Sequence, residues 1–315
     1  MWRLILGRIG LGLLTLLAVS ALVFGGTELL PGDVASAILG QSATPEAVAA
    51  IRRSLGLNDP LLQRYVHWLV SSLHGDFGTS FANGRPVMEQ VGFRFLNTIF
   101  LAGVTGAIAV PLSIILGIVA AINQKGWFNH LVNVLSLGAI SMPDFFVAYV
   151  LVLFLSVQLG WLPSLASVSS DMGLAERLRA IALPVTTLTF AVMAHMLRMT
   201  RATILSVMSQ PFIEMAFLKG LPRWRIVVDH ALPNALGPII NVVAINLAYL
   251  IVGVVVVETV FVYPGIGQLM VDAVSKRDVP VVQVCGLIFG ATYVGLNIVA
   301  DVLAILSNPR LKAPK

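Results

Sequence analysis

Six apolar segments constrain the fold of this chain more than any other feature. An α-helix needs about 20 mostly apolar residues to cross the hydrocarbon layer of a bilayer. The segments that meet or approach this length are 9–30, 97–122, 131–157, 182–199, 235–257 and 282–306. We therefore predict an all-α polytopic membrane protein with six transmembrane helices.

The composition agrees with a chain that lies mostly in lipid. Hydrophobic residues make up 57% of the sequence and charged residues only 11%, whereas a soluble domain carries roughly 25% charged residues. The formal net charge is +5, but basic residues of a membrane protein reflect its orientation, so we expect no nucleic-acid partner. The one cysteine, Cys285, lies in an apolar run, which excludes an internal disulfide and a thiolate metal site.

The first apolar segment is predicted to be a retained helix. Arg3 and Arg8 precede it, as they would precede the apolar core of a signal peptide. That core is about 7–15 residues long in signal peptides, and the apolar run here is longer.

The distribution of lysine and arginine predicts the orientation. If the N-terminus is inside, the inner segments carry eleven basic residues and the short outer loops carry four. Cytoplasmic loops are the ones enriched in basic residues. We therefore expect both termini in the cytoplasm, a long outer loop at 31–95 and a cytoplasmic loop at 200–235. We find no internal repeat or low-complexity linker, which predicts a single transmembrane domain over 1–315.

The 31–95 loop is predicted to contain short helices. Thr44 is a cap candidate followed by Pro45 at the first helical position, and Asp59 with Pro60 repeats this arrangement. Tyr65 and Trp68 suit the headgroup layer. A packing cap over the membrane helices and a docking surface for another protein both fit this loop.

The 200–235 loop is predicted to form two short helices. The first, about 204–218, ends at Gly220, because glycine favours the left-handed turn that closes a helix. The second begins at Pro222, runs to about His230 and is closed by Pro233.

This loop also has more apolar surface than an idle connection needs, which indicates a partner. The apolar residues are Phe212, Phe217, Leu218, Trp224 and Ile226. We expect a bulky side chain at Ala216 or Gly220 to keep the surface of that partner away from this loop.

The same loop resembles the EAA loop in membrane subunits of binding-protein-dependent ABC importers, whose pattern is E-A-A-x3-G-x9-I-x-L-P. Five residues match it, namely Glu214, Ala216, Gly220, Leu232 and Pro233. Two positions depart: Met215 replaces the middle alanine, and His230 replaces the isoleucine. The run His-Ala-Leu-Pro-Asn is similar to the peptide-transporter branch of the family.

Eight further segments extend the resemblance along nearly the whole chain. They are LLPGD (29–33), LGLNDPLLQRY (55–65), HGDFGTSF (74–81), SMPDFF (141–146), LGWLPS (159–164), RMTRATIL (198–205), VVVETVFVYPGIGQL (255–269) and NPR (308–310). Together they resemble the B-type permease of the dipeptide, oligopeptide and nickel importer group. This resemblance implies a type I ABC importer permease fold in the bacterial inner membrane.

The resemblance also implies the partners. They are a second, homologous permease, two ATP-binding subunits and a solute-binding protein that is periplasmic or lipid-anchored. The transported cargo is expected to be a peptide or a related small solute. The chain has no G-x-x-x-x-G-K-[ST] phosphate loop, so we expect a non-enzymatic subunit with ATP and Mg²⁺ bound only by its partners.

ATPase coupling is assigned by the resemblance to Glu214, Ala216, Phe217, Gly220, Leu232 and Pro233. Glu214 is expected to accept charge-assisted hydrogen bonds from the ATPase or to lock the turn. A solvated helix charge is the alternative for this residue.

Polar residues inside the spans are candidates for the cargo pathway, because charge at membrane depth is costly. Asp144 follows Pro143 and can either attract the amino terminus of a peptide or accept hydrogen bonds from backbone groups freed at the proline. His195 in the fourth span is expected to satisfy a contact between helices.

The fifth span carries the remaining candidates. Asn241, Asn246 and Tyr249 form a partly polar stripe that fits a pathway or interhelical hydrogen bonds. Glu258 ends this span, and its resemblance to the family implies an outer gate or a re-entrant turn.

Two other classes of protein are possible from composition alone. A self-sufficient channel or secondary transporter would need its own ion site, often marked by broken helices in matching repeats, and no such symmetry is evident. An intramembrane enzyme would need a motif such as H-E-x-x-H or G-x-S-x-G, and the sequence has neither.

Overall fold

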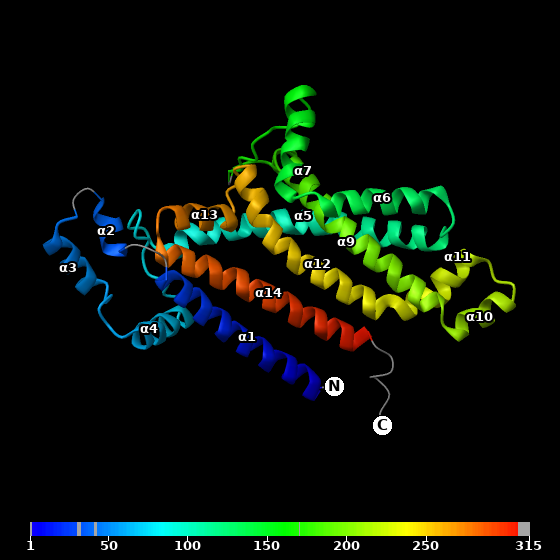
Figure 1. Cartoon of the computed structure of the whole chain (residues 1–315), viewed down its shortest axis with the longest axis horizontal. Coiled ribbons are helices and arrows are strands. Elements are labelled where there is room, and N and C mark those ends of the chain that lie inside the picture. Colours follow the sequence, from blue (N-terminus) through cyan, green and yellow to red (C-terminus); the bar gives the residue numbers. More distant parts are fainter. Residues whose placement is uncertain (1, 30–32, 41–42, 170, 308–315) are drawn as a thin grey trace. The chain divides into compact units, whose positions relative to one another are not determined.

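The computed structural model describes residues 2–29, 33–40, 43–169 and 171–307. Within these ranges the regular elements are all helices (Figure 1). Contacts divide the chain into two compact units. The first comprises Ile99–Tyr263 with Met1–Gly10 and Gly295–Lys315, and the second comprises Leu11–Thr98 with Pro264–Val294. Residues 30–32 of the LLPGD segment and the whole NPR segment lie outside the described residues.

Five long helices contain five of the six predicted spans, except that the first helix ends at Glu28, before the end of the predicted span 9–30. They are α1 (Trp2–Glu28), α5 (Val87–Ile122), α9 (Ala182–Met208), α12 (Leu232–Val260) and α14 (Val279–Ser307). Each carries a stretch that is long and apolar enough to cross a membrane. The prediction of a polytopic helical protein is therefore confirmed.

The predicted span at 131–157 is not one straight helix. It consists of α6 (Trp127–Ser141), α7 (Asp144–Leu151) and the π-helical η2 (Val152–Gln158), with a bend of 106° between α6 and α7. Met142 is extended, with φ −99° and ψ 131°, because a following proline disfavours the helical conformation. Pro143 therefore breaks this span instead of being tolerated within it.

In the first unit α9 is the central helix and packs against α12, α6 and α7. The largest core cluster of this unit includes Leu101, Leu188, Met196, Leu250 and Phe261. A close approach of α5 to α9 requires Gly117, because a Cβ there would lie 3.0 Å from Thr200. This packing leaves one face of both α9 and α12 exposed.

The second unit combines parts of α1, α5 and α14 with shorter helices. These are α2 (Val34–Leu39), α3 (Pro45–Ser54), α4 (Leu61–Leu73) and α13 (Ile266–Ser275). Its core cluster includes Val87, Val91, Ile266, Leu269 and Cys285. The segment before α5 is fixed by Asp278, which accepts hydrogen bonds from the Ser80 hydroxyl and from the Phe81 N–H.

The two predicted helix starts in this unit have different outcomes. Thr44 caps α3 as predicted, since its hydroxyl accepts a hydrogen bond from the Ala47 N–H at 3.3 Å and Pro45 is the first helical residue. The prediction that Asp59 caps α4 is wrong. Pro60 itself is extended and takes the cap position without a side-chain hydrogen bond, so the helix begins one residue later than the cap pattern implies.

Two glycines bring α14 close to α1 in the second unit. A Cβ at Gly290 would lie 2.7 Å from Cγ1 of Val19, and a Cβ at Gly286 would lie 3.0 Å from Cγ2 of Val23. The spacing Gly-x-x-x-Gly is the one that lets membrane helices approach closely. The packing of α1 on α14 therefore depends on the absence of side chains at these two positions.

Candidate functional site

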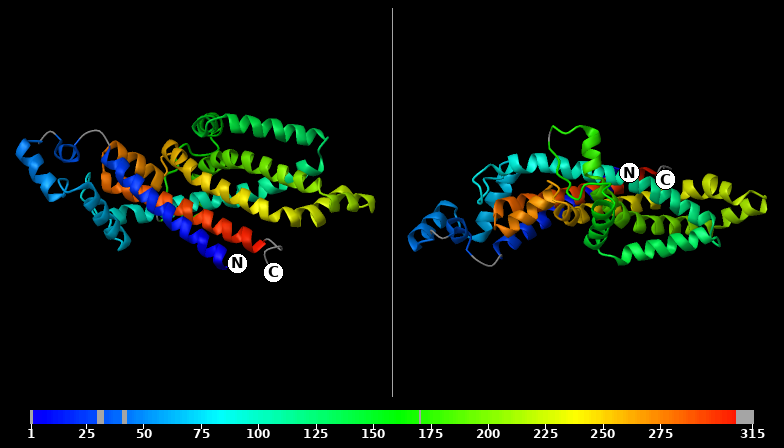
Figure 2. Two further views of the ribbon diagram at one scale, coloured as in Figure 1. Left: turned by 60° about the horizontal axis from the view of Figure 1, so that its bottom comes forward. Right: turned by 90° about the horizontal axis from the view of Figure 1, so that it is seen from above.

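Four of the predicted coupling residues lie in a helical hairpin between the end of α9 and the start of α12, and Leu232 and Pro233 are the first two residues of α12. The hairpin consists of α10 (Pro211–Leu218), α11 (Arg223–Arg225) and the π-helical η3 (Ile226–Ala231), and we call Pro211–Ala231 the α10–η3 hairpin. It occupies one extremity of the first unit, as the two further views also show (Figures 1 and 2). All of its residues belong to the first unit.

The first helix of the hairpin starts later than predicted. Instead of one helix over 204–218, α9 continues to Met208 and α10 begins at Pro211. Proline at the first helical position is favoured because the N–H that it lacks would have no partner there. The break at Ser209 and Gln210 lets α10 leave the direction of α9.

A small apolar core holds the hairpin together. Ile213 and Ala216 of α10 are buried against Ile226 and Ala231 of η3. Ala216 therefore has to be small because it packs inside the hairpin. This position is only 6% exposed, so the expectation that a larger side chain would act directly on a partner surface needs revision: it would first separate α10 from η3.

Gly220 closes α10 in the conformation that the sequence predicts. Its φ is +76°, a region that residues with a Cβ rarely adopt. The Leu221 N–H donates to the Ala216 carbonyl at 3.4 Å, and the Gly220 N–H donates to the Phe217 carbonyl at 2.9 Å. This pair of hydrogen bonds defines a Schellman motif, and Leu221 packs on the hairpin core as that motif requires.

The outer surface of the hairpin is apolar and exposed. Leu218 is 76% exposed and Trp224 is 58% exposed. The other exposed apolar side chains are Phe212, Met215, Phe217 and Val228. A patch of this kind on a segment that also carries charge is typical of a docking surface.

Glu214 lies within this patch, in the first turn of α10. Its side chain is exposed, and no hydrogen bond or ion pair joins it to another described residue. A carboxylate in this position is free to accept hydrogen bonds from a second protein. Nearby, Arg225 and Asp229 form an exposed ion pair at 3.2 Å.

The hairpin returns to the membrane helices without a break. The prediction that Pro233 closes the second helix is wrong, because η3 leads directly into α12, where Pro233 occupies the first turn. The wider π-helical turn avoids the clash between a proline ring and the preceding turn. Pro233 is exposed, and Leu232 packs against the cluster that contains Ile204, Val227 and Ala235.

Among the pathway candidates, Asp144 lies between α7 and α12. It is partly buried, and a Cβ at Gly253 would lie 3.4 Å from its Oδ2. His195 of α9 is near enough to interact electrostatically with the same carboxylate. Two helices, α7 and α9, thus bring polar side chains to one place in the first unit, beside a glycine of α12.

The predicted stripe on α12 divides between two faces. Asn241 and Tyr249 lie on the exposed face, and Tyr249 is 65% exposed. Asn246 is buried and donates to the Val242 carbonyl of its own helix at 2.7 Å. Its position is therefore that of a packing residue in this conformation.

Glu258 lies in a buried polar cluster that the sequence did not predict. Its side chain is fully buried, and its charge acts on the buried hydroxyl of Tyr263. Arg177 of α8 (Leu174–Ala180) forms a hydrogen bond with that hydroxyl. Burial raises the pKa of Tyr263 to about 12, although the hydrogen bond and charge of Arg177 lower it and Glu258 raises it further.

The same arginine contacts an aromatic ring. Its Cζ lies 4.3 Å from the centroid of Phe100, a distance at which a guanidinium is attracted to the face of a ring. This cluster joins α8, α5 and the end of α12. An arginine in a short loop and a glutamate at the end of an apolar run were its only signals in the sequence.

The residues described here contain no group of three or more His, Cys, Asp or Glu side chains that could hold a metal ion. The arrangement provides a structural connection between a surface segment and the long helices. An exposed hairpin with its own core is joined directly to two long apolar helices.

The fold defines a multi-pass membrane protein that carries an exposed, largely apolar hairpin between two of its long apolar helices. The chain belongs to the family described as binding-protein-dependent transport system inner membrane components. The family model matches residues 113–313, and the model of the N-terminal region of these membrane components matches residues 1–102. The family consists of transport permeases, not enzymes.

Relatives of known name are similar over nearly the full length. The chain is 38% identical over 312 residues to a Brucella abortus (strain 2308) protein named as a peptide transport system permease, with 99% of each chain covered. It is 38% identical over 303 residues to the glutathione transport system permease protein GsiC of Salmonella typhimurium, with 96% of each chain covered. The resemblance to an ABC importer permease that we infer from the sequence is thus confirmed.

Proposed function

We propose that this chain is one of two permease subunits in an ATP-driven importer of the bacterial inner membrane, and that it forms half of the translocation pathway. Its cargo is a peptide or a related small solute such as glutathione. The observation that carries the proposal is the exposed apolar hairpin between two membrane helices, in a chain similar to named peptide and glutathione permeases.

Energy enters through the α10–η3 hairpin, which is held by one of two separate ATPase subunits, while the other ATPase subunit acts on the second permease. Fully burying one large apolar side chain contributes about 1.5–3 kcal/mol, so Leu218, Trp224 and their neighbours supply enough surface for a stable contact. Glu214 adds charge-assisted hydrogen bonds, which fix the orientation of the ATPase subunit on the hairpin. ATP and Mg²⁺ are bound in these partners.

The hairpin is suited to transmit force. Ile213, Ala216 and Ile226 pack its two arms together, and the Schellman turn at Gly220 fixes their connection. Because η3 continues into α12 and only two residues separate α10 from α9, a displacement of the hairpin acts on both long helices. Phe217 contributes contact surface, whereas Leu232 and Pro233 fix the direction in which the hairpin joins α12.

The pathway runs along the exposed faces of α9 and α12, opposite the second permease. Tyr249 faces it, and the Asp144 carboxylate attracts the amino terminus of a peptide. Asn246 and Glu258 act from within the bundle: Asn246 supports the exposed stripe of α12, and the Glu258 cluster stabilises the outer gate. A solute-binding protein, periplasmic or lipid-anchored, delivers cargo from outside.

This mechanism requires the hairpin to face the cytoplasm, which labelling of a cysteine can test. Lys219 is exposed next to the turn, and the native Cys285 is fully buried. In the Lys219→Cys variant, a membrane-impermeant thiol reagent should label inverted vesicles and not intact cells. Labelling of intact cells would place the hairpin outside and refute the mechanism.

Charge reversal at Glu214 tests the coupling itself. In Glu214→Lys we expect insertion to be unchanged and ATPase co-purification to fall at least tenfold, because hydrogen bonds to a charged group contribute about 1.5–3 kcal/mol each. Glu46→Lys is the matched control, since Glu46 is also an exposed acid in the first turn of a helix. If both variants retain the ATPase equally, Glu214 has no coupling role.

Reconstitution separates this mechanism from a self-sufficient transporter. The chain alone should not transport. Addition of the second permease, the ATPases and the binding protein should give uptake that depends on ATP. Uptake by the isolated chain under an ion gradient alone would support the self-sufficient transporter instead.

A further inference from the structure

Helix α4 has three distinct faces. One face packs against α1 and carries Arg64, Tyr65 and Trp68. A second face is polar and carries Gln63, His67 and Ser71, which line a pocket of about 970 Å³. The third face is apolar and consists of Leu62, Val66, Val70 and Leu73. Each of these residues is exposed, with an exposed fraction between about one half and three quarters. We call these four residues the α4 apolar stripe.

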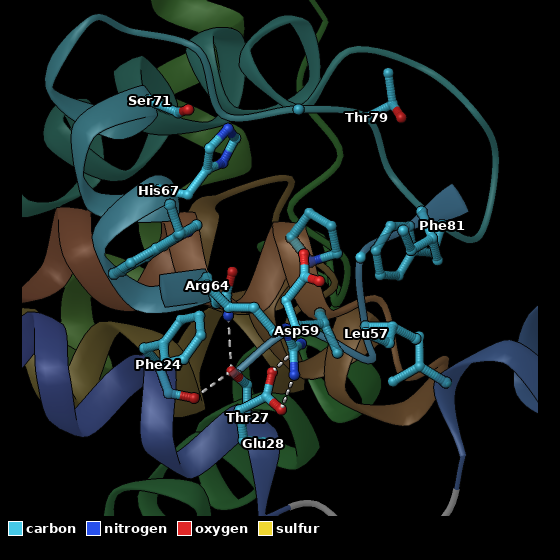
Figure 3. A pocket seen from close by; sticks show the side chains of 18 of the residues that line it. Phe24, Thr27, Glu28, Leu57, Asp59, Arg64, His67, Ser71, Thr79 and Phe81 are labelled. Carbon is cyan, nitrogen blue, oxygen red and sulfur yellow. Dashed lines mark hydrogen bonds and ion pairs between the residues drawn. The ribbon is translucent and has the colours of Figure 1, made fainter. Parts of the chain in front are cut away.

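The contact of α4 with α1 extends over two turns of α1. The Tyr65 hydroxyl is hydrogen-bonded to the Ser20 hydroxyl at 2.8 Å. The rings of Tyr65 and Trp68 both lie 5.5 Å from the ring of Phe24. Arg64 reaches the last residue of α1 and forms a two-point ion pair with Glu28, with a nitrogen–oxygen distance of 2.7 Å for one of the two bonds (Figure 3).

These contacts place α4 at a defined depth. The apolar part of α1, Ile5–Glu28, has 24 residues, which corresponds to about 36 Å of helix, whereas the hydrocarbon layer is about 30 Å thick. Ser20 lies eight residues before Glu28, about 12 Å below the end of α1. The Tyr65 side chain therefore reaches into the hydrocarbon layer, while Arg64 reaches up to its edge. The backbone of α4 lies between these two levels.

The same two contacts set the rotation of α4 about its own axis. Successive residues of a helix are about 100° apart. Tyr65 marks the side of α4 that points toward the membrane interior. Measured from Tyr65 around the helix, in the direction away from Arg64, Leu62 lies at about 60°, Leu73 at about 80° and Val66 at about 100°. The α4 apolar stripe thus faces the acyl chains.

The polar face turns the opposite way. On the other side of Arg64, which points to the end of α1, Ser71 follows at about 20° and His67 at about 60°. Both residues line the pocket, and Figure 3 shows both side chains there. Gln63 lies only about 20° from Val70 and therefore marks the boundary between the polar face and the stripe. The polar face therefore points away from the membrane interior.

From these observations we propose that α4 is a membrane-interface helix whose apolar stripe is covered by lipid. The lipid belongs to the leaflet at the C-terminal end of α1. Interfacial helices of this kind bury their apolar face about 5–10 Å into the boundary between headgroups and acyl chains. At about the same level of α1, Leu17 and Leu22 are also apolar and exposed, as expected for side chains at a depth occupied by lipid. The inference requires only that α1 spans the membrane, and it is independent of the proposed transport function.

Site-directed fluorescence quenching tests this placement. The full-length chain, with Cys285 replaced by alanine, receives one cysteine at position 66 or at position 71, labelled with a small environment-sensitive fluorophore. Each protein is reconstituted into phosphatidylcholine vesicles. The quenchers are lipids with a nitroxide at acyl carbon 5 or at carbon 12, and aqueous iodide.

We expect the label at position 66 to be quenched at least threefold more by the carbon-5 nitroxide than the label at position 71, which lies about 140° away around the helix. Iodide should show the reverse preference. A label at position 70 should behave like the one at 66, which provides a second variant of the same stripe if Val66→Cys folds poorly.

Three results would overturn the proposal. Equal quenching of positions 66 and 71 by iodide means that the stripe faces water. Protection of position 66 from the lipid nitroxides and from iodide means that a protein covers it, either a second copy of the chain or another segment. Stronger quenching by the carbon-12 nitroxide than by the carbon-5 nitroxide means that α4 lies deep in the bilayer.

Discussion

Replacement of Gly290 by alanine tests the packing of α14 on α1 at its closest point. The new Cβ would lie 2.7 Å from Cγ1 of Val19, whereas carbon atoms pack best at about 3.5–4.0 Å. Valine in a helix has one strongly preferred side-chain conformation, so Val19 does not readily rotate away. The two helices must move apart by a large fraction of an ångström.

The matched control lies one and a half turns further along the same helix. A Cβ at Gly295 would have no neighbour within 4 Å. Both alanines gain about 1 kcal/mol of helix propensity over glycine, and only Gly290→Ala also incurs the cost of overpacking, about 1–3 kcal/mol. The difference between the two variants therefore isolates the contact with Val19.

The single cysteine provides the assay. Cys285 is fully buried in the core cluster of the second unit, next to Gly286. A dye that becomes fluorescent on reaction with a thiol reports the temperature at which this cluster opens. Since 1 kcal/mol corresponds to about 2–4 °C for chains of 150–250 residues, Gly290→Ala should melt at least about 2 °C below Gly295→Ala. If Gly290→Ala melts at the same temperature or higher, α1 and α14 are not packed through this glycine.

Three further changes have defined outcomes. Ala216→Leu should destabilise the α10–η3 hairpin by about 1–3 kcal/mol through overpacking, and limited proteolysis should then cleave the hairpin at least fivefold faster. Gly220→Ala should cost about 1–2 kcal/mol because φ is +76° there, and amide exchange in α10 should rise accordingly. For Asp33, burial raises the pKa, but hydrogen bonds from Ser36 and Arg52 and the charge of Arg52 lower it more, so the net pKa lies below the ordinary 3.8. A lowered carboxylate pKa stabilises the fold fully above the unfolded pKa, and this stabilisation is lost as the pH falls through the folded pKa. The stability difference between the native chain and Asp33→Asn should therefore decrease as the pH falls below 3.8 and through the lower pKa of the folded state. A difference that stays constant in acid would refute this.

The long helices could be predicted from the sequence because the bilayer imposes a simple rule. A segment in lipid must satisfy its own backbone hydrogen bonds, so the length of an apolar run identifies a helix. Gly220 was predictable for a similar local reason, since its turn needs a residue without a Cβ. In both cases the determinant lies within a few residues of the element that it specifies.

The breaks and joins of helices were harder to predict. A proline within a span can be tolerated, as Pro111 is within α5, or can end a helix, as Pro143 does. Neighbouring helices decide which occurs, and they are distant in the sequence. Pro211 was a local signal for the start of α10, of the same kind as Pro45, whereas the continuation of η3 through Pro233 depends on a π-helical turn that has no clear sequence pattern.

The buried cluster of Glu258, Arg177 and Tyr263 could not be deduced from the sequence, because its members come from separate segments. The division of the α12 stripe has a different cause. Asn246 follows Asn241 by five residues, which is about 500° around a helix, so the two lie about 140° apart. This angle was available from the sequence and should have separated them.

The bend at Met142 and Pro143 has a consequence for biogenesis. Backbone groups freed by a broken helix are tolerated at membrane depth only when protein or an aqueous cavity covers them. Around this bend Ser141, Met142 and Phe145 are exposed in the single chain. In the proposed importer the second permease would cover this region. A copy of the chain synthesised without that partner would expose these backbone groups to lipid, where quality-control proteases could recognise them. The proposal therefore predicts that cellular levels of the chain follow the supply of the second permease.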